Sequence, residues 1–394
     1  MPSTCRAIWS ALLFSPLPAA TTSALAQDTP KEIVIGEERS IHSAILNEDR
    51  RILVGTPANY EQGDARYPVM FVLDGDAHFH HTTGLTKALA WNRFVPDLLV
   101  VAISNTDRTR DLTPPSRDPI AAQQMPTHGG AANFRSFVGD ELIPWVDANY
   151  RTRPYRILVG HSFGGLFAID TLLTRPELFN AYIAISPSLQ WDDQHLVERA
   201  DAFFDATKEL NSTLFMTAGN EGNALLGGVR KLSGVLDEKA PHGFAWHFEH
   251  MPAESHGSVP MRSTYQGLEF VFADWTMRNA FDTYESYGLD AIDGFYAKRD
   301  KKYGFDGGFP NQTIAQLVQR LLVARRFDDA ADVLSHYRGK LRPPLELLFR
   351  LANGFREQGK PGQAIEWYRQ ALEADAGNEA ARNALAELGQ NVAN

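Results

Sequence analysis

The chain has 394 residues and a net charge of −10, with an isoelectric point near 5.7. This acidic balance argues against non-specific binding to nucleic acid, whose phosphates attract basic surfaces. A chain of this length with 44% hydrophobic residues can bury one substantial core and still supply a second structural unit.

Residues 1–26 are typical of an export signal. Arg6 supplies a positive charge, residues 7–17 are mostly apolar, and Ala24-Leu25-Ala26 offers the small-x-small cleavage pattern. The alternative is an uncleaved membrane anchor, but prolines interrupt the apolar run, which is shorter than the roughly 20 residues that span a bilayer. We therefore expect a periplasmic or secreted protein that does not contact the membrane after cleavage.

The only cysteine, Cys5, lies inside this predicted signal. The mature protein would then have no disulfide, no thiolate metal site and no cysteine nucleophile. Because no cysteine stands at the predicted cleavage point, a lipoprotein is not expected.

Residues 27–280 alternate short apolar runs with amphipathic segments, of which residues 133–150 are the longest predicted helix. The runs predicted to be strands are 33–35, 51–54, 67–73, 98–103, 157–159, 182–185, 214–217 and 244–251. This order predicts an α/β fold, a mostly parallel sheet with helices on both faces. Ligands bind such sheets at the carboxyl ends of the strands.

The most informative segment is Gly160-His161-Ser162-Phe163-Gly164, which joins a strand-like run to a helix-like one. A serine at such a turn is typical of the nucleophile elbow, so Ser162 is the predicted nucleophile of a hydrolase. Gly160 and Gly164 are expected to be required because a Cβ would collide with neighbouring backbone. The amide of Phe163 would face a developing oxyanion. The alternative is a glycine-rich turn with an ordinary serine.

The other members of a catalytic triad are expected after later strands, in the order serine, acid, histidine. Glu221 follows the run 214–217, and His256 follows the run 244–251. His256 would accept and return the proton of Ser162, and Glu221 would orient the imidazole. Asp237 and Glu254 are the rival acids.

The oxyanion hole needs a second amide donor from the loop after the third core strand. Asp74-Gly75-Asp76 occupies that loop, so Gly75 or Asp76 is the expected partner of Phe163, unless the segment is a simple turn. The nearby histidines, 78, 80 and 81, do not share one helix face, so they are expected to begin a helix rather than bind zinc. No metal or organic cofactor is expected.

Four residues are expected to bind substrate: Arg108, Arg110, His161 and Trp191. The two arginines lie in a loop at a strand end, where guanidinium groups could bind anionic or catechol-like oxygens. The alternative for the arginines is a structural Arg–Asp pair that closes the loop.

Residues 281–309 are expected to be a linker, and residues 310–394 a helical region. The positions Phe355, Gly359, Ala364, Tyr368 and Ala371 match a helix-turn-helix repeat, and Leu321, Ala330, Leu334 and Tyr337 repeat much of that pattern 34 residues earlier, which is the tetratricopeptide period. A plain helical hairpin is the alternative. We expect this region to contact the catalytic domain, a dimer partner or another protein.

The chain resembles the putative esterase family of α/β-hydrolases, which contains enterobactin-type siderophore esterases, S-formylglutathione hydrolase and mycolyltransferases. The segments that carry the resemblance are 67–76, 108–114, 160–165, 185–188 and 254–257. The resemblance implies that Ser162 is the nucleophile and His256 the base. The loops 74–76 and 108–114 are most similar to the siderophore esterase branch, whose compact members lack the helical tail.

Together these patterns predict an exported serine esterase that acts on a small-molecule ester, such as a siderophore trilactone, through an acyl-enzyme. One alternative is acyl transfer by the same triad. The other is a non-catalytic binding protein that uses the helical tail.

Overall fold

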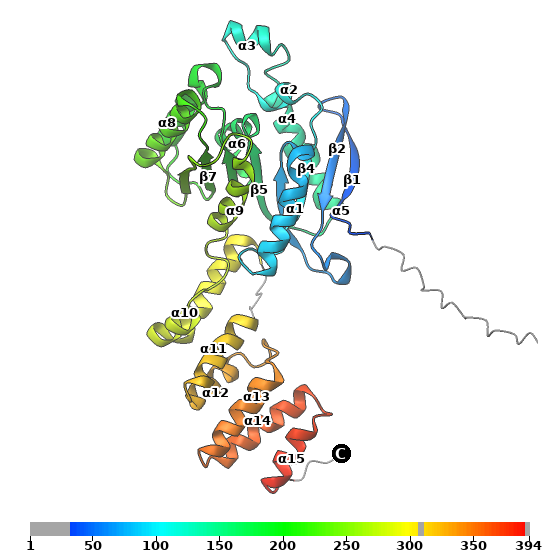
Figure 1. The fold of residues 1–394 in the computed structure, drawn as a ribbon, viewed down its shortest axis with the longest axis vertical. Helices are drawn as coiled ribbons and strands as arrows, with labels where there is room; N and C mark the ends of the chain where they lie inside the picture. The colour runs from blue at the N-terminus through cyan, green and yellow to red at the C-terminus, as the bar shows by residue number, and fades with distance from the viewer. Residues whose placement is uncertain (1–31, 306–310, 391–394) are drawn as a thin grey trace, which may run out of the picture. The chain divides into compact units, whose positions relative to one another are not determined.

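The computed structural model describes residues 32–305 and 311–390, and its core is an eight-stranded sheet (Figure 1). The strand order is β1-β2-β4-β3-β5-β6-β7-β8. The strands are β1 (Glu37–Ser43), β2 (Glu48–Gly55), β3 (Tyr67–Val72), β4 (Leu99–Ile103), β5 (Thr152–His161), β6 (Ala181–Ile185), β7 (Thr213–Ala218) and β8 (Ala245–His250). The predicted signal, residues 1–26, and Cys5 lie outside the described residues.

The sheet is parallel from β4 to β8, and antiparallel only where β2 joins β1 and β4. The carboxyl ends of β3 to β8 therefore lie along one edge, where side chains far apart in the sequence can meet. The predicted α/β fold with a mostly parallel sheet is confirmed.

Alternate residues of the strands enter two different hydrophobic clusters. In β3, Val69 and Phe71 belong to one cluster, and Met70 and Val72 belong to the other. This division follows from the period of two in a strand, and it explains why the central strands are apolar throughout. Helices α1 and α9 pack on the second cluster, and the helices from α4 to α8 cover the first (Figure 1).

The helices of this domain are α1 (Gly75–Trp91), α2 (Arg108–Leu112), α3 (Pro119–Gln124), α4 (Ala131–Ser136), α5 (Ile143–Asn149), α6 (Phe163–Thr174), α7 (His195–Ala206), α8 (Asn223–Lys239) and α9 (Val259–Val271). Short helical turns are η1 (Tyr60–Gln62), η3 (Pro176–Leu178) and η4 (Trp191–Gln194). The predicted helix 133–150 is α4 and α5 joined by a π-helical turn, η2 (Phe137–Leu142).

The first predicted strand is wrong. Residues 33–35 have no regular secondary structure, and the side chain of Ile33 is 94% exposed. The first strand is instead β1, at the edge of the sheet, where most side chains face solvent. An edge strand needs few apolar residues, so the apolar run at 33–35 was the misleading signal.

Beyond the sheet the chain continues as helices. They are α10 (Ala280–Tyr303), α11 (Asn311–Val323), α12 (Phe327–His336), α13 (Leu345–Glu357), α14 (Pro361–Ala374) and α15 (Glu379–Glu387). The residues 281–309 that we expected to be a linker are thus mostly helix α10, which breaks only at Gly288, where φ is 72°.

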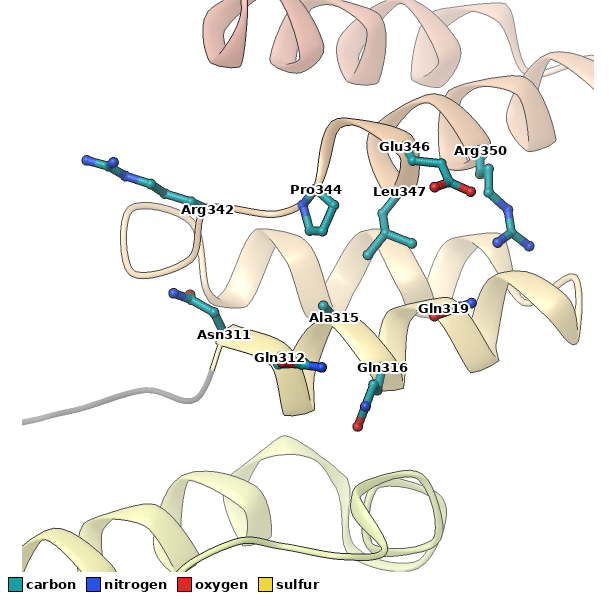
Figure 2. Close-up of a pocket in the computed structure, with 10 residues that line it drawn as sticks. All are labelled: Asn311, Gln312, Ala315, Gln316, Gln319, Arg342, Pro344, Glu346, Leu347 and Arg350. Carbon is teal, nitrogen blue, oxygen red and sulfur yellow. The ribbon is translucent and has the colours of Figure 1, made fainter. Parts of the chain in front are cut away.

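Of the nine repeat positions predicted from the sequence, the eight other than Gly359 are buried in one cluster of the C-terminal helices, and Gly359 is exposed. The turn between α13 and α14 has Gly359 at a φ of 71°, and the turn between α11 and α12 has Arg325 at 57°. Positive φ favours glycine, so the first helical pair departs from the pattern at the turn that joins its helices. A cavity of about 430 Å³ lies between α11 and α13, lined by glutamines of α11 and by Glu346 and Arg350 (Figure 2).

Within the described residues, no helix has both the length and the apolar character needed to cross a membrane.

Candidate active site

Ser162 stands alone between β5 and α6, as a nucleophile elbow requires. Its φ is 61° and its ψ is −115°, a conformation that costs roughly 1–3 kcal/mol for a residue with a side chain. The Ser162 amide donates a hydrogen bond to the carbonyl of Ile185 at the end of β6, at 2.9 Å. The neighbouring strand therefore holds the turn in place.

The glycines around Ser162 have different roles from those we expected. A Cβ on Gly160 would lie 2.2 Å from the carbonyl oxygen of Gly164, so no other residue fits there. A Cβ on Gly164 would meet only ordinary contacts at 3.4 Å. The second close approach belongs to Gly165, where a Cβ would lie 2.9 Å from Cα of Pro187. The expectation for Gly160 is confirmed, and that for Gly164 is wrong.

We predict that Gly160→Ala lowers the free energy of unfolding by about 3 kcal/mol, because the added methyl group meets backbone that cannot move aside. Gly164→Ala is the matched variant and should change it by less than about 1 kcal/mol. Urea unfolding of both variants measures the difference. Equal losses would contradict this account of the elbow.

Glu221 and His256 meet at the carboxyl ends of β7 and β8. Nδ1 of His256 donates to Oε1 of Glu221 at 2.9 Å. The side chain of Glu221 is only 3% exposed, whereas that of His256 is 44% exposed. Glu221 is therefore held inside the protein, whereas the imidazole of His256 is partly exposed.

The two rival acids lie elsewhere. Glu254 accepts a hydrogen bond from Ser258 at 2.7 Å and pairs with Arg262 at 3.4 Å. Asp237 is in the last turns of α8, roughly 20 Å along the helix axis from the end that adjoins Glu221. Of the three candidate acids, Glu221 is the one hydrogen bonded to His256.

Ser162, Glu221 and His256 line one cavity of about 350 Å³. Its other lining residues are Ser188, Gln190, Asn220, Ala224 and Leu225. Oγ of Ser162 lies 3.2 Å from Oγ of Ser188.

Two serines of the site were missed by the sequence analysis. Ser186 donates to Oε1 of Glu221 at 2.7 Å, and Ser188 contacts Ser162. One turn after β6 thus contacts both Glu221 and Ser162. The sequence signal for these serines is the segment Ser186-Pro187-Ser188 at a strand end, which contributed only to the resemblance to the putative esterase family.

Phe163 and Gly75, both expected at the oxyanion hole, are the first residues of α6 and α1. Amides in the first turn of a helix have no partner within the helix, so the amides of Phe163, Gly75 and Asp76 are potential donors. A Cβ on Gly75 would lie 2.9 Å from the carbonyl carbon of Ile103, so glycine at this position lets the start of α1 pack closely against β4.

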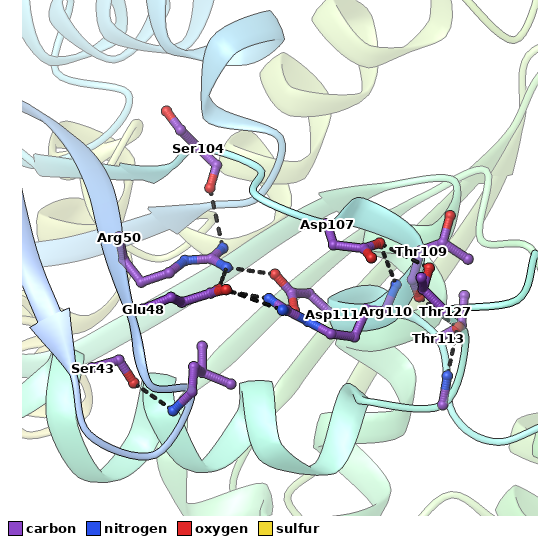
Figure 3. A network of polar contacts seen from close by, with 12 residues as sticks. Ser43, Glu48, Arg50, Ser104, Asp107, Thr109, Arg110, Asp111, Thr113 and Thr127 are labelled. Atoms are coloured by element: carbon purple, nitrogen blue, oxygen red, sulfur yellow. Dashed lines mark hydrogen bonds and ion pairs between the residues drawn. The ribbon is translucent and has the colours of Figure 1, made fainter.

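Arg110 belongs to a buried network that ties α2 to β2 (Figure 3). Its guanidinium group donates to Glu48 at 2.6 and 3.0 Å and to Asp111 at 2.7 Å. The buried Arg50 joins the same two carboxylates. Hydrogen bonds from Arg110 and Arg50, opposed by burial, hold the pKa of Glu48 below its ordinary value. These contacts favour the structural alternative for Arg110.

We predict that Arg110→Gln destabilises the protein by about 1.5–3 kcal/mol, the range for lost hydrogen bonds to charged groups. The Michaelis constants for esters should not change. Thermal unfolding together with steady-state kinetics tests both parts. A higher Michaelis constant for a catecholate ester at unchanged stability would instead show that Arg110 binds substrate.

Arg108, in contrast, points to the elbow. Nε and Nη2 donate to the two carboxylate oxygens of Asp74 at 2.6 and 3.0 Å, and Nη2 also donates to the carbonyl of His161 at 3.2 Å. Its guanidinium carbon lies 5.4 Å from the ring centre of Phe163.

The other two predicted substrate-binding residues, His161 and Trp191, pack beside His256 and Phe163. The rings of His161 and His256 are 4.4 Å apart. Burial, assisted by His256, lowers the pKa of His161 to about 3, so its imidazole is neutral at physiological pH. Trp191 is buried, donates to the carbonyl of Pro114 at 3.1 Å and lies edge-on to Phe163.

The predicted helix that begins near the three histidines is α1. The rings of His78 and His81 are 5.2 Å apart, and that of His78 is 5.8 Å from His161. Burial lowers the pKa of His81 to about 4. In the part of the chain that the structure describes, no group of three potential metal ligands is close enough to hold an ion.

Residues 43–222 match the family model described as putative esterase, and residues 344–388 match a tetratricopeptide repeat model. The predicted resemblance to the putative esterase family is confirmed by the first match. This esterase is a carboxylic ester hydrolase with an α/β-hydrolase fold, and its C-terminal helices confirm the predicted tetratricopeptide-like extension.

The esterase is 28% identical to the ferri-bacillibactin esterase BesA of Bacillus subtilis over 57% of this chain and 84% of that protein. It is 32% identical to the siderophore triacetylfusarinine C esterase of Aspergillus fumigatus, over 40% of this chain and 57% of the fungal protein. Among solved structures, it resembles an IroE-like serine hydrolase of Shewanella oneidensis with a TM-score of 0.64 at 27% identity. That match covers 77% of this chain and 99% of the other.

Proposed function

We propose that this esterase is an exported serine hydrolase of siderophore esters that works through Ser162, His256 and Glu221. The main support for this proposal is the 2.9 Å hydrogen bond from His256 to the buried Glu221, in the same cavity as Ser162. An acid, a base and a nucleophile gathered at adjacent strand ends provide the three roles of acyl transfer to serine.

In the first half of the reaction, Oγ of Ser162 attacks the ester carbonyl carbon and its proton passes to Nε2 of His256. Glu221 stabilises the resulting imidazolium through Nδ1. The amide of Phe163, with that of Gly75 or Asp76, binds the oxyanion. The bond to the leaving alcohol then breaks, and the alcohol oxygen takes the proton from His256.

In the second half, water attacks the acyl-enzyme while His256 accepts its proton. The new tetrahedral intermediate releases the carboxylic acid, and the proton returns from His256 to Oγ of Ser162. An alcohol in place of water would give acyl transfer with the same residues.

The substrate class rests on the relatives, two of which are named as siderophore esterases. The lining residues beside the triad are uncharged, which suits a substrate whose groups next to the ester carry no charge. Gln190 and Asn220 offer amide groups to a polar substituent near that ester.

The test is a panel of a catechol trilactone, a feruloyl ester, an acetylated sugar and p-nitrophenyl acetate. We expect kcat/KM for the catechol trilactone to exceed that of the other esters by at least about 100-fold, since remote binding energy lowers the barrier of the cognate substrate. Equal values across the panel would contradict the siderophore assignment. Analysis of the products with an added alcohol distinguishes hydrolysis from acyl transfer.

A further inference from the structure

The two strand ends that supply the oxyanion-hole amides are joined by one side chain. Asp74 directly precedes Gly75, and His161 lies two positions before Phe163. Arg108 donates hydrogen bonds to both Asp74 and the carbonyl of His161. We propose that Arg108 is a positioning residue that sets the distance between the two halves of the oxyanion hole. This inference rests on the proposed function.

The contact with Asp74 has the geometry of a rigid link. Two nearly parallel hydrogen bonds join a planar guanidinium group to a planar carboxylate, and a single rotation about either group would break one of them. The side chain of Asn105 donates a further hydrogen bond to Asp74 at 2.7 Å. Asn105, which follows β4, and Arg108, in α2, therefore hold this carboxylate in place together.

Asp74 also needs external support for its backbone. Its φ of 55° and ψ of 48° place it in the left-handed region, which costs energy for a residue with a Cβ. Burial would raise the pKa of Asp74, but the hydrogen bonds from Arg108 keep it below the ordinary value. The Asp74 side chain is ionised and accepts two hydrogen bonds from Arg108, and this fixes the direction of the next amide, that of Gly75.

The contact with the elbow completes the link. Nη2 of Arg108 reaches the carbonyl of His161, and the guanidinium group lies over the ring of Phe163. The start of α6 also lies near Asp74, since a Cβ added to Gly164 would be 3.4 Å from Oδ2 of Asp74. A loss of Arg108 would thus let the loop before α1 move relative to the elbow.

This role differs from substrate binding in what a variant would change. A substrate ligand affects only esters large enough to reach it, mainly through the Michaelis constant. A positioning residue of the oxyanion hole lowers kcat for every ester, because the hole stabilises the tetrahedral state common to all of them.

The experiment measures kcat and KM of Arg108→Gln with p-nitrophenyl acetate and with a catechol trilactone. We expect kcat to fall about 10- to 100-fold for both esters with KM within about threefold, less than the loss from removal of an oxyanion donor. The affinity of a boronic acid, which mimics the tetrahedral state, should fall by a similar factor. Arg108→Lys should be intermediate, since one ammonium group cannot bond both oxygens of Asp74 and the His161 carbonyl.

Arg108→Gln leaves the Asp74 carboxylate buried without its cation, and the variant could fail to fold. The double variant Asp74→Asn/Arg108→Gln removes both charges and should fold while showing the same loss of kcat. Arg199→Gln is the matched control, because Arg199 is 37% exposed against 35% for Arg108 and also pairs with a buried aspartate, Asp170. It should retain the kcat of the unmodified protein.

A normal kcat for p-nitrophenyl acetate in the double variant would overturn the proposal, as would a loss confined to the KM of the catechol trilactone. Fluorophosphonate labelling separates this failure from failure of the proposed function. If the function is wrong, the unmodified protein is not labelled at Ser162. If only the role of Arg108 is wrong, the unmodified protein and the double variant are labelled at the same rate.

Discussion

Ser162→Ala is expected to reduce ester hydrolysis by about 10⁴-fold or more, the largest effect of any single change in this esterase. The methyl group cannot form the acyl-enzyme bond, and the remaining donors of the oxyanion hole act only on attack by water. The fold should be retained, because the turn depends on Gly160, Gly165 and the amide of Ser162 rather than on the hydroxyl group.

A fluorophosphonate probe provides the direct measurement for Ser162. It should label the unmodified protein and leave Ser162→Ala unlabelled, with equal melting temperatures for the two proteins. Equal labelling would show that another residue is the nucleophile.

Glu221→Gln should lower kcat by about 10³- to 10⁴-fold, as expected when the residue that orients a catalytic histidine loses its charge. The neutral amide cannot stabilise the imidazolium, and its NH₂ group would favour the wrong tautomer of His256. The amide fits the same space, and the Ser186 hydroxyl group can rotate to accept a hydrogen bond from the NH₂ group, so the fold should not change.

Glu254→Gln and Asp237→Asn are the matched controls for Glu221, because each removes one carboxylate from the same half of the domain. Both should change kcat by less than about threefold, since neither side chain is hydrogen bonded to His256. If Asp237→Asn proved to be the damaging change, the acid would have to be reassigned.

The sequence predicts the central strands well and the edge of the sheet poorly. β3, β4, β6, β7 and residues 157–160 of β5 are buried on both faces, so their composition alone identifies them. β1 is paired on one side only and is largely polar, and its position depends on pairing with β2 that no local pattern reveals.

The proximity of Ser162, Glu221 and His256 could be predicted because each lies within a few residues of a strand end, and parallel strands bring their carboxyl ends together. The contacts that orient these groups could not. The link from Arg108 to Asp74 and the hydrogen bond from Ser186 to Glu221 depend on rotamers and loop paths. Likewise, the sequence does not distinguish Arg108 from Arg110. In the fold, Arg108 contacts the elbow and Arg110 contacts β2.

Helix α10 contributes side chains to two hydrophobic cores. Tyr303 is fully buried in the cluster shared with α1 and α9, and its hydroxyl group donates to the carbonyl of Val271 at 2.7 Å. Ile292 and Tyr296, earlier in the same helix, are buried among the C-terminal helices. A fragment that ends at residue 280 would therefore lack Tyr303 and have a cavity of that size in the core of the sheet domain. A fragment that ends after Tyr303 would remove Ile292 and Tyr296 from the core of the C-terminal helices. No single cut in this helix yields two fragments with intact interiors.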